Sequence, residues 1–463
     1  MRKMDHEKYV DQNMPSIISD LQKLIRQPSV SAKNLGLEEC ARLVVGIMKS
    51  AGIQAEILRM GGKVPPVVYG EVRSRKNPGK TLLFYNHYDV QPEEPLDLWK
   101  DPPFSGKVRG NRIYGRGSAD DKGELITRIK AVEALLRTTG DVPCNIKFLV
   151  EGEEEVGSMH VEEYLKRFRK KFSCDGVIWE FGYVDEKDRP IISLGMKGLL
   201  YVELSAKESV RDAHSSLAVL IENPAWRMVE ALNTLRDRNG TILIRDWYKE
   251  ADTFTREELG VIANEPFDET SFKKEYGISR FVAGKKGLEA RKAIVGAPTC
   301  NIAGFSSGWE GPGAKTVLPS KAKVKIDFRL VPKMDPLRQL SRLRRHLKEK
   351  GFGDVEVKMI HGEAAARTKI SDPLVKVVQK AADMSFGRSV VSVSSAGTGP
   401  MYYFSRVLGA PCISVGSTYV YARIHSPNEF ARIDLLRKTT KCMCLIIEGF
   451  GTLMLSEKTS SGK

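Results

Sequence analysis

The 463-residue sequence has no apolar run near the roughly 18 residues that a membrane-spanning helix needs. No apolar segment follows the charged start M-R-K-M-D-H-E-K, so a signal peptide is not expected. The seven cysteines include no C-x-x-C pair, and an odd count is untypical of a disulfide framework. These absences argue against a membrane or secreted protein and predict a reduced, cytoplasmic protein with buried thiols.

Acidic residues are not in excess. The 73 lysines and arginines outnumber the 58 aspartates and glutamates, and the net charge is +15. Much of this excess is scattered along stretches such as residues 337–350, without the aromatic side chains that accompany basic ones in nucleic-acid-binding surfaces. We therefore expect neither nucleic acid nor a membrane as a partner. A non-catalytic, basic nucleic-acid-binding or scaffold protein stays open as an alternative.

The length exceeds one ordinary hydrophobic core, so at least two domains are expected. Short apolar stretches at residues 80–86, 145–150 and 176–179 read as strands, and residues 125–136 between the first two have helical spacing. An alternation of strands and helices is typical of a doubly wound α/β domain.

From about residue 199 the pattern changes. Strands are predicted at residues 199–206, 299–305, 321–330 and 354–360, and helices at 223–235 and 337–350. A long irregular stretch is predicted at 241–297. This order describes an α+β unit, after which the α/β pattern returns. We therefore predict a catalytic domain in two parts, residues 1–198 and 364–463, interrupted by an inserted α+β domain over residues 199–363.

One stretch, residues 85–122, contains several side chains that can bind a metal ion. His87 and Asp89 follow a predicted strand, and Asp120 and Asp121 precede a predicted helix. Open α/β sheets bind ligands at the carboxyl ends of their strands. Imidazole and carboxylate together suit zinc or another first-row divalent metal.

Further candidates stand at the ends of later elements. Glu153, Glu154 and Glu155 follow one strand, Glu180 follows the next, and His425 lies in Y-A-R-I-H-S-P-N-E. A two-metal hydrolase needs one carboxylate that bridges the ions, which lie about 3.5 to 4 Å apart with a hydroxide between them. One of three adjacent glutamates can bind metal while a neighbour acts as general base.

Seven motifs resemble, in order, those of the M20 family of dinuclear zinc peptidases, in particular its carnosinase and Cys-Gly dipeptidase branch. They are H-Y-D-V-Q-P, G-R-G-S-A-D-D-K-G, E-G-E-E-E-V-G-S, D-A-H-S-S, G-P-G-A-K-T-V-L-P, F-R-L-V-P and R-I-H-S-P-N-E. The resemblance implies that the inserted domain is a ferredoxin-like lid and dimerisation domain, and that the protein is a homodimer.

The same resemblance implies a ligand set for two divalent metal ions per subunit. His87, a bridging Asp120 and Glu180 would hold one ion, and Asp120, Glu155 and His425 the other. Zinc is expected, with manganese or cobalt as alternatives.

Catalytic roles follow from the resemblance as well. Glu154 would be the general base, and Asp89 would orient the imidazole of a metal ligand. The peptide between Asp120 and Asp121 is expected to be cis. His214, in the inserted domain, would reach the active site of a partner subunit and stabilise the oxyanion.

For the substrate, the resemblance implies that Arg329, with Thr316 and Thr398 near it, binds a carboxylate, and that His361 is a further contact. The sequence departs from the dipeptidase branch at Ser395, where an acidic residue is usual. We expect hydrolysis of an amide bond in dipeptides or short peptides with a free C-terminal carboxylate. The alternative is an N-acyl amino acid deacylase or desuccinylase with the same metal site.

Overall fold

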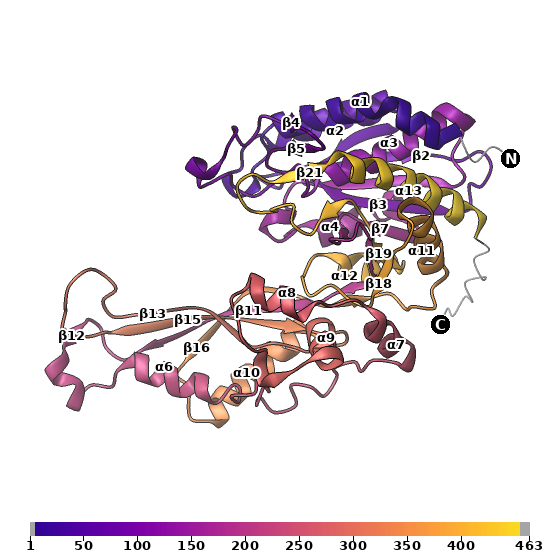
Figure 1. Ribbon diagram of the computed structural model, residues 1–463. Coiled ribbons are helices and arrows are strands. Elements are labelled where there is room, and N and C mark those ends of the chain that lie inside the picture. Colours follow the sequence, from indigo (N-terminus) through magenta and orange to yellow (C-terminus); the bar gives the residue numbers. More distant parts are fainter. Residues whose placement is uncertain (1–4, 454–463) are drawn as a thin grey trace. The chain divides into compact units, whose positions relative to one another are not determined.

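The computed structural model describes residues 5–453, which form two compact units (Figure 1). Unit 1 contains residues 5–195, 368–392 and 403–453, and unit 2 contains residues 196–367 and 393–402. The sequence placed the domain boundaries after residues 198 and 363, a few residues from these. The short segment 393–402, which belongs to unit 2, was not predicted.

Unit 1 is built on an eight-stranded sheet with the order β1-β2-β6-β3-β7-β19-β9-β18. Its strands are β1 (Gln54–Leu58), β2 (Val67–Val72), β3 (Thr81–His87), β6 (Asn145–Glu151), β7 (Gly176–Trp179), β9 (Ile191–Ser193), β18 (Val390–Ser392) and β19 (Cys412–Ser414). The four central strands, β6, β3, β7 and β19, are parallel, whereas β1, β2 and β6 pair antiparallel. The sheet is therefore a doubly wound α/β sheet with an antiparallel edge.

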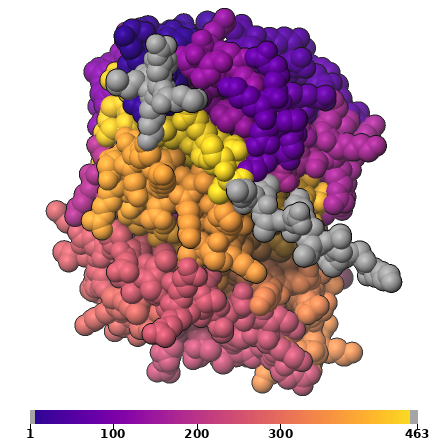
Figure 2. All heavy atoms as spheres, turned by 90° about the vertical axis from the view of Figure 1, so that its right-hand side faces the viewer, coloured from indigo at the N-terminus to yellow at the C-terminus, as the bar shows by residue number. Residues whose placement is uncertain are grey.

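Helices of unit 1 pack against one another and against this sheet. They are α1 (Asp5–Arg26), α2 (Leu37–Ser50), α3 (Lys122–Thr139), α4 (Val161–Arg167), α5 (Arg169–Phe172), α11 (Pro373–Phe386), α12 (Met401–Tyr403, which reaches across the boundary between the units) and α13 (Ile433–Thr452). Helix α3 contacts α1, α13 and strand β3, so nearly all of its first thirteen residues are buried. Helices α11 and α13, orange and yellow in Figure 2, lie side by side.

Smaller strands complete unit 1. They are β4 (Lys107–Arg109), β5 (Arg112–Tyr114) and β21 (Phe430–Arg432) in one sheet, and β8 (Tyr183–Val184) with β20 (Thr418–Tyr419) in another. All seven cysteines are buried, as predicted, and none of them is in a disulfide bond. Among residues 5–453 there is no helix with the length and apolar character needed to cross a membrane.

Unit 2 has the β-α-β-β-α-β order of a ferredoxin-like fold. Its elements are β11 (Gly198–Lys207), α6 (Pro224–Asn233), β13 (Asn301–Ser307), β15 (Lys321–Leu330), α10 (Pro336–Glu349) and β16 (Glu356–Glu363). The sheet order is β13-β15-β11-β16, and all neighbours are antiparallel. Alternate residues of β15, such as Val324, Ile326 and Phe328, are buried, as a strand with one covered face requires. The short strands β12 (Ala213–His214) and β14 (Val317–Leu318) form a separate pair.

The expectation of an irregular stretch at 241–297 was wrong. The structure has three helices there, α7 (Arg256–Asn264), α8 (Glu269–Glu275) and α9 (Gly287–Gly296). A capping box of Thr255 and Glu258 begins α7, and Asp268 caps α8. These helices are short, and each buries two side chains or fewer, so the sequence lacks the apolar stripe on which a helix prediction depends.

Candidate metal centre

Three neighbouring parallel strands of unit 1 bring the candidate ligands together. His87 is the last residue of β3, Glu154 and Glu155 follow β6, and Glu180 comes directly after β7. Because β6, β3 and β7 are adjacent and parallel, their carboxyl ends meet at one edge of the sheet.

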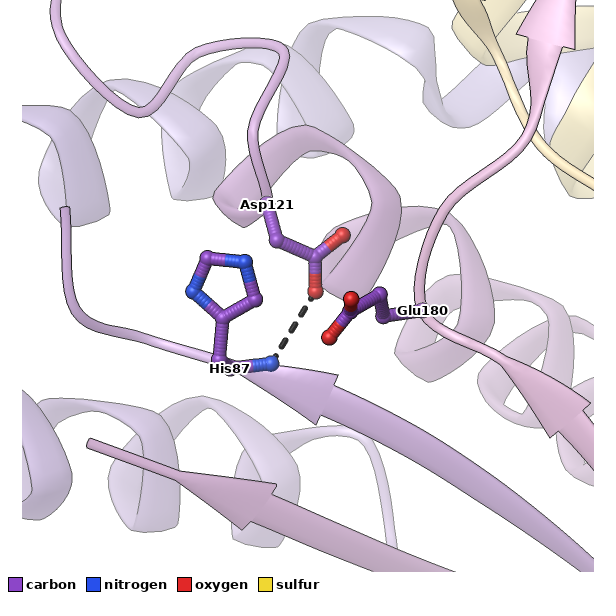
Figure 3. Close-up of side chains that lie close together, drawn as sticks. All are labelled: His87, Asp121 and Glu180. Carbon is purple, nitrogen blue, oxygen red and sulfur yellow. Dashed lines mark hydrogen bonds between the residues drawn. The ribbon is translucent and has the colours of Figure 1, made fainter. Parts of the chain in front are cut away.

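One group of possible ligands consists of His87, Asp121 and Glu180, whose side chains point toward one another (Figure 3). One ligand atom from each lies within 4.8 Å of the others. Asp121 Oδ2 accepts hydrogen bonds from the backbone N–H of His87 at 3.1 Å and from the Asn86 side chain at 2.7 Å. The sequence had given Asp121 no part in this group. Its peptide bond to Asp120 is cis, as predicted.

A second group consists of Asp120, Glu155 and His425, again with ligand atoms within 4.8 Å of one another. His425 Nε2 lies 3.2 Å from Asp120 Oδ2 and 3.1 Å from Glu155 Oε2. The loop after β20 delivers His425 from far along the chain, with a positive φ of 57° that non-glycine residues rarely adopt.

Asp120 touches both groups. Its Oδ1 lies 3.2 Å from His87 Nε2, while its Oδ2 faces His425. Each oxygen of one carboxylate is therefore directed at a different imidazole, as in a carboxylate that bridges two cations.

Asp89 contacts the His87 imidazole and the backbone of the two glutamates that follow β6. This fully buried carboxylate lies 3.3 Å from His87 Nδ1, and its two oxygens accept the backbone N–H groups of Glu154 at 3.2 Å and Glu155 at 3.1 Å. The backbone carbonyl of Asp89 is also 3.0 Å from His87 Nδ1. The imidazole ring therefore directs Nε2 toward Asp120.

The electrostatics of the site reflect crowded, poorly hydrated carboxylates. Loss of hydration raises the pKa of Glu154 and Glu180 well above the usual range, and neighbouring carboxylates add to the effect, Glu155 on Glu154 and Glu154 on Glu180. Desolvation and Asp120 raise the pKa of Glu155. For Asp120 itself, burial acts in the same direction, but hydrogen bonds from His425 and His87 outweigh it and lower the pKa. Such a concentration of negative charge requires cationic compensation.

The donor set fits divalent cations. Two imidazoles and several carboxylates converge, which is the ligand chemistry of zinc and similar metals. In the described part of the chain, Asp121 Oδ1, Glu155 Oε1 and Glu180 Oε2 are buried without a hydrogen-bond partner. Buried polar atoms are normally paired, so these oxygens are available to a cation.

Comparison with known proteins agrees with this geometry. Residues 83–449, most of the chain, match the model of peptidase family M20/M25/M40. The chain belongs to this family. It is an M20 metallopeptidase, as its motifs predicted.

The relatives of this M20 peptidase include dipeptidases. The beta-Ala-His dipeptidase of Rattus norvegicus is 27% identical over 401 residues, which cover 84% of this chain and 79% of that protein. The Cys-Gly metallodipeptidase dug1 of Schizosaccharomyces pombe is 30% identical over 343 residues, covering 70% and 71%. The crystal structure of the metallo-carboxypeptidase Sso-CP2 from Sulfolobus solfataricus is 36% identical, covers 94% of this chain and 99% of its own, and has a TM-score of 0.89.

In unit 2 of the M20 peptidase, Arg329 donates a hydrogen bond to Thr398 Oγ1 at 2.6 Å. Both side chains are partly exposed. His361, on β16, lies near the same end of the sheet, because Leu199 pairs with both Arg329 and Glu363. Its Nε2 is 3.7 Å from Glu363 Oε2.

Thr316 does not lie near Arg329, and this corrects the sequence analysis. Thr316 precedes Lys321, the first residue of β15, whereas Arg329 is close to the last. Eight residue steps of extended strand separate Lys321 from Arg329, about 26 Å. Instead, the Thr316 carbonyl accepts the N–H of Ser215, next to His214. The exposed His214 has its Nδ1 2.9 Å from Ser216 Oγ.

Sequence reasoning missed two buried ion pairs beside the metal centre, Arg116–Glu429 and Glu124–Arg128. Their side chains are at most 1% exposed. Glu429 is part of the recognised motif R-I-H-S-P-N-E, but it lies 313 positions from Arg116, a separation that predicts no contact. Glu124 and Arg128 do have the i,i+4 spacing at which side chains meet on a helix, which was the available signal for that pair.

Proposed function

We propose that this M20 peptidase hydrolyses the amide bond of dipeptides or short peptides that have a free C-terminal carboxylate, with Glu154 as general base. The observation that carries the proposal is the position of Asp120 between His87 and His425. Relatives named as dipeptidases and as a metallo-carboxypeptidase support the substrate class.

The site would hold two divalent cations. His87, Asp120 and Glu180 would bind one, and Asp120, Glu155 and His425 the other. Zinc suits these nitrogen and oxygen ligands, and manganese or cobalt would fit the same set. When bound, such cations would supply Lewis-acid chemistry, the activation of a water molecule and the polarisation of the scissile carbonyl.

Glu154 is suited to the proton transfers. Lost hydration and neighbouring carboxylates raise its pKa, which brings a glutamate toward the range where a general base works best. Its backbone N–H is fixed by Asp89. We infer that Glu154 takes a proton from the attacking water and passes it to the leaving amine, while Asp89 keeps His87 oriented.

Arg329 and Thr398 would bind the substrate carboxylate. A guanidinium matches a carboxylate with two parallel hydrogen bonds, and the Thr398 hydroxyl already lies against it. His361 would contact the substrate from the same end of the sheet. Thr316 supports a different segment, the one that carries His214.

We further propose a homodimer in which His214 of one subunit serves the site of the other and stabilises the oxyanion. Unit 2 exposes an edge strand, β13, and an unusual set of large apolar side chains, Leu217, Val219, Leu220, Trp226, Val229, Ile302 and Phe305. Exposed apolar surface and an unpaired strand edge both favour association with a second copy. Seven buried cysteines outside disulfide bonds fit a reducing compartment such as the cytoplasm.

A second candidate is an N-acyl amino acid deacylase or desuccinylase. The succinyl-diaminopimelate desuccinylase of Coxiella burnetii is 26% identical over 327 residues. Both substrate classes present an amide and a carboxylate, so the same side chains could serve either.

The experiment is a comparison of substrates on the zinc-loaded enzyme. Turnover of dipeptides, their C-terminal amides, and N-acetyl and N-succinyl amino acids would be followed by release of the free amine. We expect dipeptides to be cleaved and their amides to react poorly. Turnover confined to acyl amino acids would replace the dipeptidase proposal with the deacylase, and no turnover of any amide would contradict both.

A further inference from the structure

We propose that the buried pair Arg116–Glu429 positions the metal ligands, by fastening the segment that carries Asp120 to the segment that carries His425. The inference rests on the proposed metal-dependent function, and it assigns a role to two residues that do not themselves reach the site. Neither residue lies in either group of possible ligands.

Glu429 receives hydrogen bonds from four donors. Its Oε1 accepts the backbone N–H groups of Ala119 at 3.0 Å and Asp120 at 3.2 Å. Its Oε2 accepts the N–H of Gly117 at 3.1 Å and the Arg116 guanidinium at 2.7 Å. One carboxylate therefore holds three backbone amides in a run of four residues that ends at the ligand Asp120.

The turn that presents these amides depends on Gly117. Its φ is 80°, and a Cβ at this position would lie 2.5 Å from Val90 Cγ1. The backbone can therefore fold this tightly only with glycine, and folded in this way it directs its N–H groups at Glu429. The conformation of the turn itself therefore determines that these N–H groups face Glu429.

Arg116 extends the contact to two further segments. It donates to the carbonyl of Pro92, five residues after His87, at 3.1 Å, and toward the carbonyl of Ser426, next to His425, at 3.5 Å. Both members of the pair are 1% exposed. The pair therefore joins the segments that carry three of the five proposed ligands, His87, Asp120 and His425.

Removal of one partner would leave the other charge buried and uncompensated, and the amides would lose a common acceptor. Metal affinity depends steeply on ligand position, and loss of a residue that orients ligands typically weakens binding about 10-fold to 100-fold. The expected defect of a Glu429 variant is therefore in metal affinity, and the chemistry of a fully loaded site should survive.

The other buried pair provides a contrast. Arg128 donates to the backbone carbonyls of Trp179, which precedes Glu180, and Val415. It faces Glu124, which accepts the N–H of Ser417. This pair supports the Glu180 side of the centre, whereas Arg116–Glu429 supports the Asp120 and His425 side.

The test is the zinc affinity of Glu429→Gln, measured by competition with a chromogenic chelator, together with the visible spectrum of the Co²⁺-substituted protein. The amide group of glutamine would place donors against the backbone N–H groups. We expect about 10-fold to 100-fold weaker binding of at least one zinc ion, an altered Co²⁺ spectrum, and recovery of hydrolysis at high zinc. Glu154→Gln, by contrast, should bind zinc normally and should not recover.

Glu258→Gln is the control, because Glu258 forms an ion pair with Arg367 within unit 2 whose side chains are only 8% and 10% exposed. This variant should unfold more easily and keep both zinc affinities. If Glu429→Gln is poorly folded by circular dichroism, Arg116→Lys keeps the charge and loses the forked contacts, with the same expectation. Wild-type zinc affinities in a folded Glu429→Gln or Arg116→Lys would overturn the positioning role. Failure of the wild type to bind two zinc ions would instead contradict the proposed function.

Discussion

The carboxylate of Asp89 accepts the backbone N–H of Glu154 at 3.2 Å. The same carboxylate lies 3.3 Å from His87 Nδ1, so one buried aspartate sets both a proposed metal ligand and the backbone of the proposed base. The strand ends of β3 and β6 are thereby fixed relative to each other at the point where the reaction would take place. Substitutions at this site should therefore distinguish residues that bind metal from residues that transfer protons or bind substrate.

Glu154→Gln should remove the base and leave the metal ligands intact. General base catalysis contributes about 100-fold to 10,000-fold, so kcat should fall by that range. Zinc content, measured by elemental analysis, should match the wild type. Glu153→Gln is the neighbouring control, since Glu153 faces His160 at 2.9 Å and should keep most activity. Hydrolysis by Glu154→Gln at the wild-type rate would assign the base elsewhere.

Arg329→Lys should weaken substrate binding, because lysine cannot reproduce the two parallel hydrogen bonds of a guanidinium. A charged hydrogen bond contributes about 1.5 to 3 kcal/mol, so KM for a dipeptide should rise about 10-fold or more. The wild type and the variant should process a dipeptide amide equally slowly. Lys325→Ala, at an exposed position of the same strand, is the control. An unchanged KM for the free dipeptide would exclude Arg329 from carboxylate binding.

His214→Ala and Glu154→Gln should each be inactive alone and complement each other when mixed. If His214 acts on the partner's site, a heterodimer contains one intact site. Random exchange between equal amounts should then restore about one quarter of the wild-type rate in a two-fold symmetric dimer. The rate would be measured after subunit exchange and compared with unmixed proteins. Absence of any recovery, with exchange verified by differently tagged subunits, would contradict action across the dimer.

The candidate ligands can be proposed from the sequence because they are local features. His87 and Glu180 stand at the carboxyl ends of short apolar strands, and parallel strands bring such ends together whatever the remaining topology. The order of strands and helices in unit 2 was likewise visible in its periodicities, whereas its ferredoxin-like fold was implied by the motif resemblance. The antiparallel edge of the main sheet was not, because periodicity does not determine strand neighbours.

Tertiary contacts explain what the sequence missed. Glu429 and Asp120 are more than 300 positions apart, and only folding brings that carboxylate to the turn around Gly117. The Arg116–Glu429 pair joins residues 313 positions apart and follows no periodic pattern, so Arg116 looked like any other arginine. The position of Thr316 was predicted wrongly because the motif resemblance carries no information about the extended strand that separates this residue from Arg329.

Lys197 supplies a pH-dependent prediction away from the metal centre. Its side chain is 4% exposed and donates to the Ala297 carbonyl, at the end of α9, at 2.7 Å. Desolvation, together with the charge of Arg329, lowers its pKa from 10.5 to about 8. Between pH 8 and 10.5 the folded protein therefore binds fewer protons here than the unfolded chain, and stability contributed by this site rises with pH.

Lys197→Met removes this titration and keeps a side chain of similar length. The free energy of unfolding of each protein would be measured by urea denaturation at several values from pH 7 to pH 10.5. The difference between wild type and variant should shift in favour of the wild type across that window, by about 3 kcal/mol in total. The lost hydrogen bond to Ala297 adds a contribution of its own, but the rise with pH should come from the proton. A difference that stayed constant from pH 7 to pH 10.5 would show that the Lys197 pKa is the same in the folded and unfolded chains.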